Sequence, residues 1–192
     1  MSGLTLVLGG ARSGKSELAL RLATASGRPV LYVATARAGD DEMARRIDAH
    51  RAQRPPAWRT VEEPLRVVEA LEAARVGPEG FVVVDCLTLW ASNLMLAGAA
   101  EDDIAAVAAR LVRWRANAGC ALCVVSNEVG LGLVPDTALG RAYRDALGRA
   151  NATLAAAAGR VLLAVAGLAL ELSAAGARPI AEFGPLPEAA RA

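Results

Sequence analysis

Histidine, cysteine and aromatic residues are scarce in this sequence. Its 192 residues include one His and three Cys, and 4% of them are aromatic. Cys86, Cys120 and Cys123 make an odd number without regular spacing, which excludes the disulfide framework of a small secreted domain. The three tryptophans are too dispersed to form a stacking platform for nucleic-acid bases. We therefore expect a protein of a reducing compartment, the cytoplasm.

The chain also lacks an excess of either charge and any long hydrophobic run. Lys plus Arg total 21 and Asp plus Glu 20, so no basic field exists to gather nucleic acid or anionic lipid. The longest strongly apolar run, residues 161–170, is about half the length that a membrane-spanning helix needs. No basic segment, hydrophobic segment and cleavage site follow one another at the N-terminus. We expect no membrane span and no nucleic-acid partner, and any anion site must be local.

Cys120 and Cys123 have the C-x-x-C spacing of some redox and metal sites. They lie at the entrance to an apolar run rather than at the start of a helix, where a reactive thiolate would be stabilised. No other Cys or His cluster could complete a zinc site. We therefore expect neither redox chemistry nor zinc at these residues.

What is abundant is apolar sequence in short, continuous runs. Residues 4–8, 30–34, 81–84, 121–125 and 161–165 resemble strands covered on both faces. Helical stretches separate them at residues 15–25, 41–52, 64–74, 88–96, 103–118 and 137–158. This alternation predicts an α/β fold with a mostly parallel sheet and helices on both faces. Residues 1–192 fit one domain, with residues from about 171 to 192 as a C-terminal extension of unassigned role.

The sequence GGARSGKS at residues 9–16 is a full match to G-x-x-x-x-G-K-[ST], placed between a strand and a helix. In this motif backbone N–H groups cradle phosphates at a helix N-terminus. Lys15 would reach the β and γ phosphates, and the Ser16 hydroxyl would bind Mg²⁺. The alternative is an ordinary glycine-rich turn. The predicted nucleotide contacts here are Gly9, Gly10, Ala11, Arg12, Ser13, Gly14, Lys15 and Ser16.

A second acidic signal follows the predicted strand at residues 81–84. Asp85 stands where proteins with this phosphate-binding loop place a carboxylate linked to Mg²⁺. An Asp at this point could instead cap the next helix. Together with the loop at residues 9–16, the metal or nucleotide role is the better interpretation.

His50, the only histidine, lies near the end of the predicted helix at residues 41–52. Arg46, Arg51 and Arg54 surround it within about one turn, so the segment could bind phosphate and keep the imidazole neutral and nucleophilic. The alternatives are a structural histidine and a solvated helix face on which Asp48 pairs with an arginine.

Five blocks, in this order, resemble one family far more specifically than the phosphate loop alone. They are GGARSGKS at 9–16, YVATA at 32–36, DDEMARRIDAHRAQRP at 40–55, NEVGLGLVP at 127–135 and RAYRDALGRAN at 141–151. The chain from residue 4 to about 167 is similar to the bifunctional adenosylcobinamide kinase and adenosylcobinamide-phosphate guanylyltransferases of cobalamin synthesis. The resemblance implies a P-loop NTPase fold.

It also implies that His50 accepts GMP from GTP as a covalent intermediate and that Lys15 serves catalysis. The substrates would be adenosylcobinamide, its phosphate and GTP or ATP, with Mg²⁺ held by Ser16 and Asp85. Members of the family look like homotrimers, so the resemblance implies a homo-oligomer. The further nucleotide contacts that the resemblance carries over are Ala34, Thr35, Ala36, Arg51, Ala52, Gln53, Arg54, Glu62 and Asp85.

Two other functions stay open from the residues themselves. The chain could be a single-activity kinase for another small metabolite, with His50 only structural. It could also be a nucleotide-dependent switch in which Glu62 or Asp85 senses the γ-phosphate. The segment at residues 127–135 follows a strand and contains two glycines, so it is either a plain connection or a loop that helps shape the substrate site.

Overall fold

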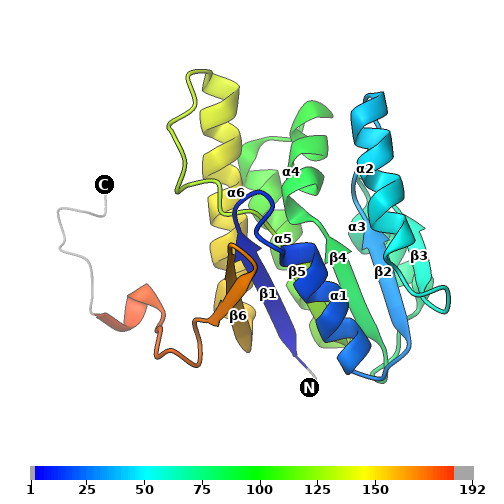
Figure 1. Ribbon diagram of the computed structural model, residues 1–192. Coiled ribbons are helices and arrows are strands. Elements are labelled where there is room, and N and C mark those ends of the chain that lie inside the picture. The colour runs from blue at the N-terminus through cyan, green and yellow to red at the C-terminus, as the bar shows by residue number, and fades with distance from the viewer. Residues whose placement is uncertain (1–2, 184–192) are drawn as a thin grey trace.

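A seven-stranded sheet forms the centre of the molecule, as a computed structural model of residues 3–183 shows (Figure 1). Its strand order is β3-β2-β4-β5-β1-β6-β7, and within the described residues only the β6–β7 pair is antiparallel. The predicted α/β fold with a mostly parallel sheet is confirmed. The strands are β1 (Leu4–Gly9), β2 (Val30–Ala34), β3 (Arg59–Glu62), β4 (Phe81–Asp85), β5 (Ala121–Val125), β6 (Arg160–Val165) and β7 (Leu168–Glu171).

Helices cover both faces of this sheet. In Figure 1 α1 lies in front of the strands, while α4, α5 and α6 lie behind them, and α2 stands beside the edge formed by β2 and β3. The helices are α1 (Lys15–Ala25), α2 (Asp41–Ala52), α3 (Val67–Ala74), α4 (Leu87–Leu96), α5 (Glu101–Ala118) and α6 (Ala138–Ala157), and a short 3₁₀ helix, η1 (Ile180–Phe183), follows β7.

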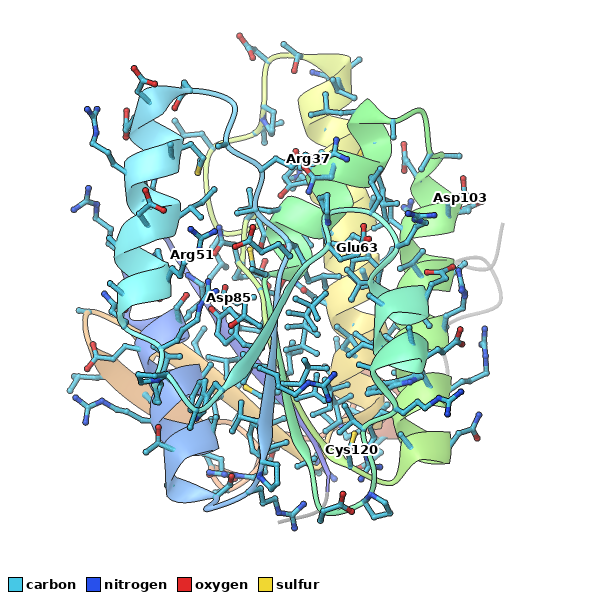
Figure 2. All side chains as sticks on the ribbon, turned by 90° about the vertical axis from the view of Figure 1, so that its right-hand side faces the viewer. Arg37, Arg51, Glu63, Asp85, Asp103 and Cys120 are labelled. Atoms are coloured by element: carbon cyan, nitrogen blue, oxygen red, sulfur yellow. The ribbon has the colours of Figure 1, made fainter. Side chains whose placement is uncertain are left out.

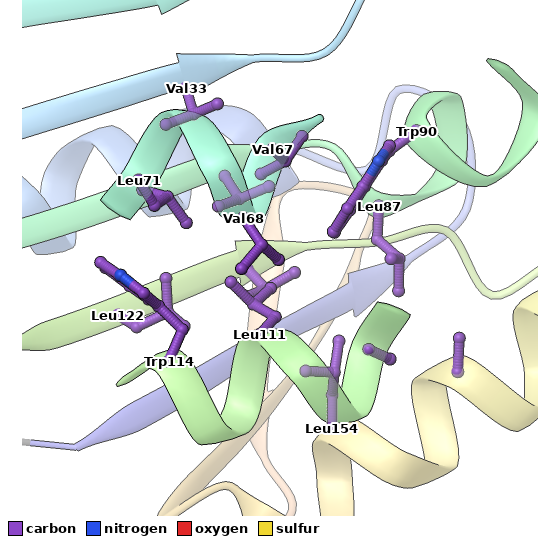
Figure 3. Packing of buried hydrophobic residues seen from close by; sticks show 14 of the residues in the cluster. Val33, Val67, Val68, Leu71, Leu87, Trp90, Leu111, Trp114, Leu122 and Leu154 are labelled. Carbon is purple, nitrogen blue, oxygen red and sulfur yellow. The ribbon is translucent and has the colours of Figure 1, made fainter. Parts of the chain in front are cut away.

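Each central strand supplies side chains to two cores because successive residues point to opposite faces. One core packs α1 against the sheet through Ala19, Ala23 and Val7. The larger one packs α3, α4, α5 and α6 on the other face, and Figure 3 shows Leu71, Trp90 and other buried side chains of it. Both faces are thus covered, which is why the central strands read as unbroken apolar runs.

Three short elements were not predicted, and one helix begins later than expected. The edge strand β3 is mostly exposed, so it has no apolar run to reveal it. The apolar run at residues 161–170 forms two strands rather than one. Ala166 and Gly167, both at positive φ, make the turn of the β6–β7 hairpin. The predicted helix at residues 64–74 starts at Val67, because the Glu63 carboxylate accepts from the backbone N–H of Leu65 and Arg66 and holds a turn there. The predicted C-terminal extension begins at about residue 171, where β7 ends; η1 lies within it, and residues 184–192 lie outside the described residues.

The helix that carries the histidine is attached differently from the others. No side chain of α2 is buried, whereas each of the other α-helices contributes to a core. Its sequence still specifies it well: Asp40 caps the N-terminus by accepting from the Met43 N–H at 2.7 Å, and Asp41 and Glu42 complement the helix dipole. No helix among residues 3–183 is both long and apolar enough to cross a membrane.

Candidate active site

The loop between β1 and α1 needs glycine where it turns. Gly9 has φ +154°, and a Cβ there would lie 2.3 Å from the Ala164 carbonyl oxygen and 2.7 Å from the Ser13 hydroxyl oxygen. Gly14, at φ +97°, is the N-cap of α1 and leaves the first N–H groups of that helix without side-chain acceptors. The first turn of α1 is therefore open to an anion, which is what the motif predicts.

Lys15 lies across this loop. Its Nζ donates to the Gly10 carbonyl at 2.5 Å and to the Ser13 hydroxyl at 3.4 Å, and the residue is 8% exposed. Burial lowers the pKa of Lys15 below its usual value, and the electrostatic interactions with Cys86 and Asp85 oppose that shift. A bound phosphate would replace the neutral carbonyl acceptor with an anionic one.

Two neighbouring segments support the loop from the far side. The Gly167 N–H, in the β6–β7 turn, donates to the Ser13 carbonyl at 3.1 Å. The Glu128 N–H, just after β5, donates to the Gly9 carbonyl at 3.2 Å. These bonds fix the backbone of the phosphate loop to elements that lie more than 100 residues away in the sequence.

Asp85 ends β4 beside the cavity and is held by the next strand. The Tyr32 hydroxyl of β2 donates to Asp85 Oδ2 at 2.5 Å. The guanidinium of Arg54 stacks on the Tyr32 ring, with its carbon 4.0 Å from the ring centroid. Burial, followed by the nearby Asp85 carboxylate, raises the pKa of Tyr32 well above its usual value, so the phenol stays protonated as a donor.

One cavity of about 510 Å³ lies between the phosphate loop and α2. The loop supplies Lys15 and Ser16 to its wall, β4 supplies Asp85, and α2 supplies His50. Figure 2 shows Asp85 beside α2, near Arg51. The predicted site residues that line the cavity are Ala11, Arg12, Ser13, Gly14, Lys15, Ser16, Ala34, Ala36, His50, Gln53, Arg54, Glu62 and Asp85.

The other predicted contacts lie outside the cavity wall. Gly9 is buried where the loop turns, Gly10 is exposed, and Ala52 is exposed at the end of α2. Arg51 forms ion pairs with Asp48 and with Glu62 of β3, and so joins the end of α2 to the sheet edge. The side chains of both pairs are at least half exposed, so the pairs contribute little to the stability of the fold. Their effect is to orient the end of α2 relative to β3.

Thr35 is fully buried and all its polar groups have protein partners. Its N–H donates to the Asp85 carbonyl, and its hydroxyl both donates to the Cys86 carbonyl and accepts from the Cys86 N–H. Its own carbonyl accepts from the Asn93 side chain. It fixes the peptide between Asp85 and Cys86, which is cis, and it does not line the cavity.

Several lining residues were not predicted. Tyr32, Cys86, Thr88 and Leu89 all face the cavity. For Tyr32 a signal existed, since it is the polar aromatic residue in an otherwise apolar strand. Asn127, the first residue of the segment at 127–135, also lines the cavity, and its N–H donates to the Thr88 hydroxyl at 2.7 Å. Beyond Asn127 this segment exposes Leu131 and Leu133 to solvent.

The C-x-x-C pair lies in the interior of the fold. Cys120 and Cys123 are free and buried, and burial raises the pKa of Cys123 to about 12. A thiol that stays protonated near neutral pH is neither a good nucleophile nor a metal ligand.

A magnesium ion fits this donor set only in company with phosphates. No group of three or more His, Cys, Asp or Glu side chains in residues 3–183 could hold a metal ion alone. Ser16 offers a hydroxyl in the cavity, and Asp85 offers Oδ1, which no hydrogen bond within the described chain engages. Mg²⁺ commonly takes one or two protein oxygens together with substrate phosphates and water, so these two residues fit it.

Comparison with known proteins agrees with this geometry. The sequence model of the cobinamide kinase / cobinamide phosphate guanyltransferase family matches residues 5–172. The bifunctional adenosylcobalamin biosynthesis protein CobP of Pseudomonas aeruginosa is 49% identical over 147 residues, covering 73% of this chain and 80% of that protein. The proteins called CobU of Escherichia coli and Salmonella typhimurium are each 39% identical over 154 residues, covering 74% of this chain and 84% of theirs. The chain belongs to the cobinamide kinase / cobinamide phosphate guanyltransferase family.

Proposed function

We propose that this chain is a bifunctional enzyme of cobalamin biosynthesis. It phosphorylates adenosylcobinamide with ATP or GTP, and then transfers GMP from GTP to the phosphate so formed, giving adenosylcobinamide-GDP. One observation carries the assignment of both steps to one site: the phosphate loop and His50 line the same cavity from opposite sides. A nucleotide lying along the cavity can therefore present different phosphorus atoms to different attacking groups.

In the kinase step the hydroxyl of adenosylcobinamide attacks the γ-phosphorus. The bond from that phosphorus to the β–γ bridging oxygen breaks, and the nucleoside diphosphate leaves. Lys15 and the N–H groups at the start of α1 are placed to neutralise charge on the transferred group, which is the main requirement of phosphoryl transfer. Glu62 and Asp85, two of the carboxylates in the cavity wall, are the proposed acceptors of the proton of the hydroxyl.

In the guanylyl step an imidazole nitrogen of His50 attacks the α-phosphorus of GTP, and pyrophosphate leaves. A phosphate oxygen of adenosylcobinamide phosphate then attacks the same phosphorus, and the N–P bond breaks to restore His50. Arg54, Gln53 and Arg46 lie around the cavity on the same helix or just beyond its end, where cationic groups stabilise the charge that develops. Splitting the transfer in this way predicts ping-pong kinetics.

Ser16 and Asp85 would hold Mg²⁺ together with the nucleotide phosphates, and the ion would supply positive charge against the phosphate oxygens. The two steps need attack at different phosphorus atoms, and the weak attachment of α2 to the core allows His50 to change its distance from the loop. Gly39, which precedes the helix, is the proposed hinge. We further propose that the enzyme is cytoplasmic and assembles as a homo-oligomer, with the homotrimer as the form that the family resemblance implies.

Labelled GTP tests the assignment directly. We expect the purified protein, incubated with Mg²⁺ and GTP labelled at the α or the γ position, to carry an acid-labile GMP adduct with α label only. His50→Ala should lose the adduct and keep GTP binding, because the phosphate loop is unchanged. Arg45→Ala is the matched control, since Arg45 is an exposed residue of the same helix that does not line the cavity.

The alternatives predict different results. If GTP binds but no adduct forms, the covalent mechanism is wrong and a single-activity kinase becomes the better assignment. Slow hydrolysis of the nucleotide with no transfer to any acceptor would indicate a switch protein instead.

A further inference from the structure

Tyr32 is placed unlike the other polar residues of the site. It sits in the middle of β2, 2% exposed, in a strand whose five residues are all buried. β2 pairs with β4 in parallel register, so that Tyr32 lies opposite Val83 and Ala34 lies opposite Asp85. The Tyr32 side chain therefore extends along the sheet towards its carboxyl end, and its hydroxyl meets Asp85 Oδ2 at 2.5 Å.

Arg54 is the third residue of this arrangement, and it stacks on the Tyr32 ring. Its guanidinium carbon lies 4.0 Å from the centroid of the Tyr32 ring. Its Nε and Nη1 are buried and have no hydrogen-bond partner in the described residues. Burying unpaired donors of a cation is costly, so this arrangement is stable chiefly where an anion comes to meet them. Both atoms belong to a residue that lines the cavity where the nucleotide phosphates are expected.

We propose that Tyr32 is the positioning residue of this site: its hydroxyl orients the Asp85 carboxylate towards Mg²⁺-nucleotide, and its ring holds the Arg54 guanidinium towards the phosphates. This inference rests on the proposed function, because it assumes that Mg²⁺-nucleotide occupies the cavity. It adds a role for a residue that neither touches the phosphates nor binds the metal.

The hydroxyl can orient the carboxylate because it occupies one of its two oxygens. With Oδ2 taken by the phenol, Oδ1 is left free of protein hydrogen bonds, and rotation of the carboxylate would break a short bond to a buried donor. The ring acts separately, because cation–π stacking fixes the plane of the guanidinium without using any of its N–H donors. The two halves of Tyr32 thus serve two different groups, and substitution can separate them.

Binding of GTP, measured by calorimetry with Mg²⁺ and again with EDTA, tests both halves. Tyr32→Phe keeps the ring and loses the hydroxyl, so the strengthening of GTP binding by Mg²⁺ should fall by about tenfold, the scale of one hydrogen bond to a charged group. Its affinity in EDTA should match the wild type within about twofold, because Arg54 still stacks. Tyr32→Leu should lose affinity in EDTA as well, by a further factor of about three to ten.

Two more variants make the readout specific to Asp85. In an Asp85→Asn background the Tyr32→Phe change should have no further effect on the Mg²⁺ dependence, because the hydroxyl acts through the carboxylate. Tyr143→Phe is the matched control, since the chain has two tyrosines and the Tyr143 hydroxyl donates to the Thr88 carbonyl at 3.0 Å instead. It should leave the ratio of affinities with and without Mg²⁺ unchanged.

A spectroscopic measurement avoids the substitution of Tyr32 altogether. Fluorotyrosine incorporated into Tyr143→Phe labels Tyr32 alone, because only two tyrosines exist. We expect its ¹⁹F resonance to shift when Mg²⁺ is added to the GTP-bound protein.

The proposal is overturned if Mg²⁺ strengthens GTP binding to Tyr32→Phe as much as to the wild type, or if the effect of Tyr32→Phe adds to that of Asp85→Asn. It is also overturned if the ¹⁹F resonance of Tyr32 does not shift when Mg²⁺ is added. These results leave the proposed function intact as long as the wild type binds GTP and forms the His50 adduct. Absence of GTP binding by the wild type would instead overturn the proposed function.

Discussion

Replacing Gly9 by alanine should destabilise the fold and damage the phosphate loop together. The added Cβ would lie 2.3 Å from the Ala164 carbonyl oxygen and 2.7 Å from the Ser13 hydroxyl oxygen, and φ is +154°. Overpacking costs about 1–3 kcal/mol, and a side chain in this region of φ adds about 1–3 kcal/mol. We therefore expect a loss of about 2–6 kcal/mol in the free energy of unfolding, and a fall in Tm of about 4–24 °C for a chain of this size.

Gly10→Ala is the matched control for this experiment. A Cβ at Gly10 meets nothing within 4 Å, and its φ is not in the positive range, so its unfolding free energy should change by less than about 1 kcal/mol. Urea unfolding followed by circular dichroism measures both variants, and GTP titration measures the loop. Equal unfolding midpoints for Gly9→Ala and Gly10→Ala would refute the steric argument, because only Gly9→Ala places a methyl group against Ala164 and Ser13 and a side chain at a positive φ.

Two further predictions concern ionisable groups. Lys15 is the only lysine, so ¹³C-lysine labelling gives one side-chain signal, and its pKa should lie below the usual value because of burial; Asp85→Asn should lower it further by removing a nearby negative charge. The pKa of Lys15 is lower in the folded state than in the unfolded state. Between these two pKa values the unfolded state binds more protons, so the free energy of unfolding should rise as pH rises through this range. A Lys15 signal that titrates above 10.5 would contradict this prediction. Burial raises the pKa of Cys86 to about 11 and of Cys123 to about 12, so a thiol reagent at pH 8 should react slowly with the native protein. Once urea unfolds the protein, the reagent should react with all three cysteines. Rapid labelling of the native protein would disprove the inertness of the C-x-x-C pair.

The sequence predicted the elements that obey a simple pattern. α1, α2, β2 and β5 have the bounds expected from it, because their residues follow one rule of periodicity and their ends carry clear signals, such as Asp40 before α2 and Gly119 before β5. β3 and β7 could not be found in this way. β3 is a mostly exposed edge strand, and the β6–β7 turn depends on a positive φ at Ala166, a residue type that gives no warning of it.

Prediction of the site divides along the same line. The phosphate loop and Asp85 follow a local motif, and the cavity contains them. The lining by Thr88 and Leu89 depends on where α4 starts relative to the sheet, which no local pattern encodes. Thr35, by contrast, is expected among the nucleotide contacts, but its hydroxyl forms its hydrogen bonds within the protein. It donates to the Cys86 carbonyl and accepts from the Cys86 N–H.

The position of β1 has a consequence for how the chain folds during its synthesis. β1 is made before its two neighbours in the sheet, β5 and β6, which begin at residues 121 and 160. At about 5–20 residues per second, a ribosome needs on the order of ten seconds to go from β1 to the first of these partners. During that time the backbone N–H and C=O groups along both edges of β1 lack their strand partners and are accessible to chaperones. The phosphate loop is thus made before the segments that support it, and it is complete only when the β6–β7 turn at Gly167 reaches Ser13.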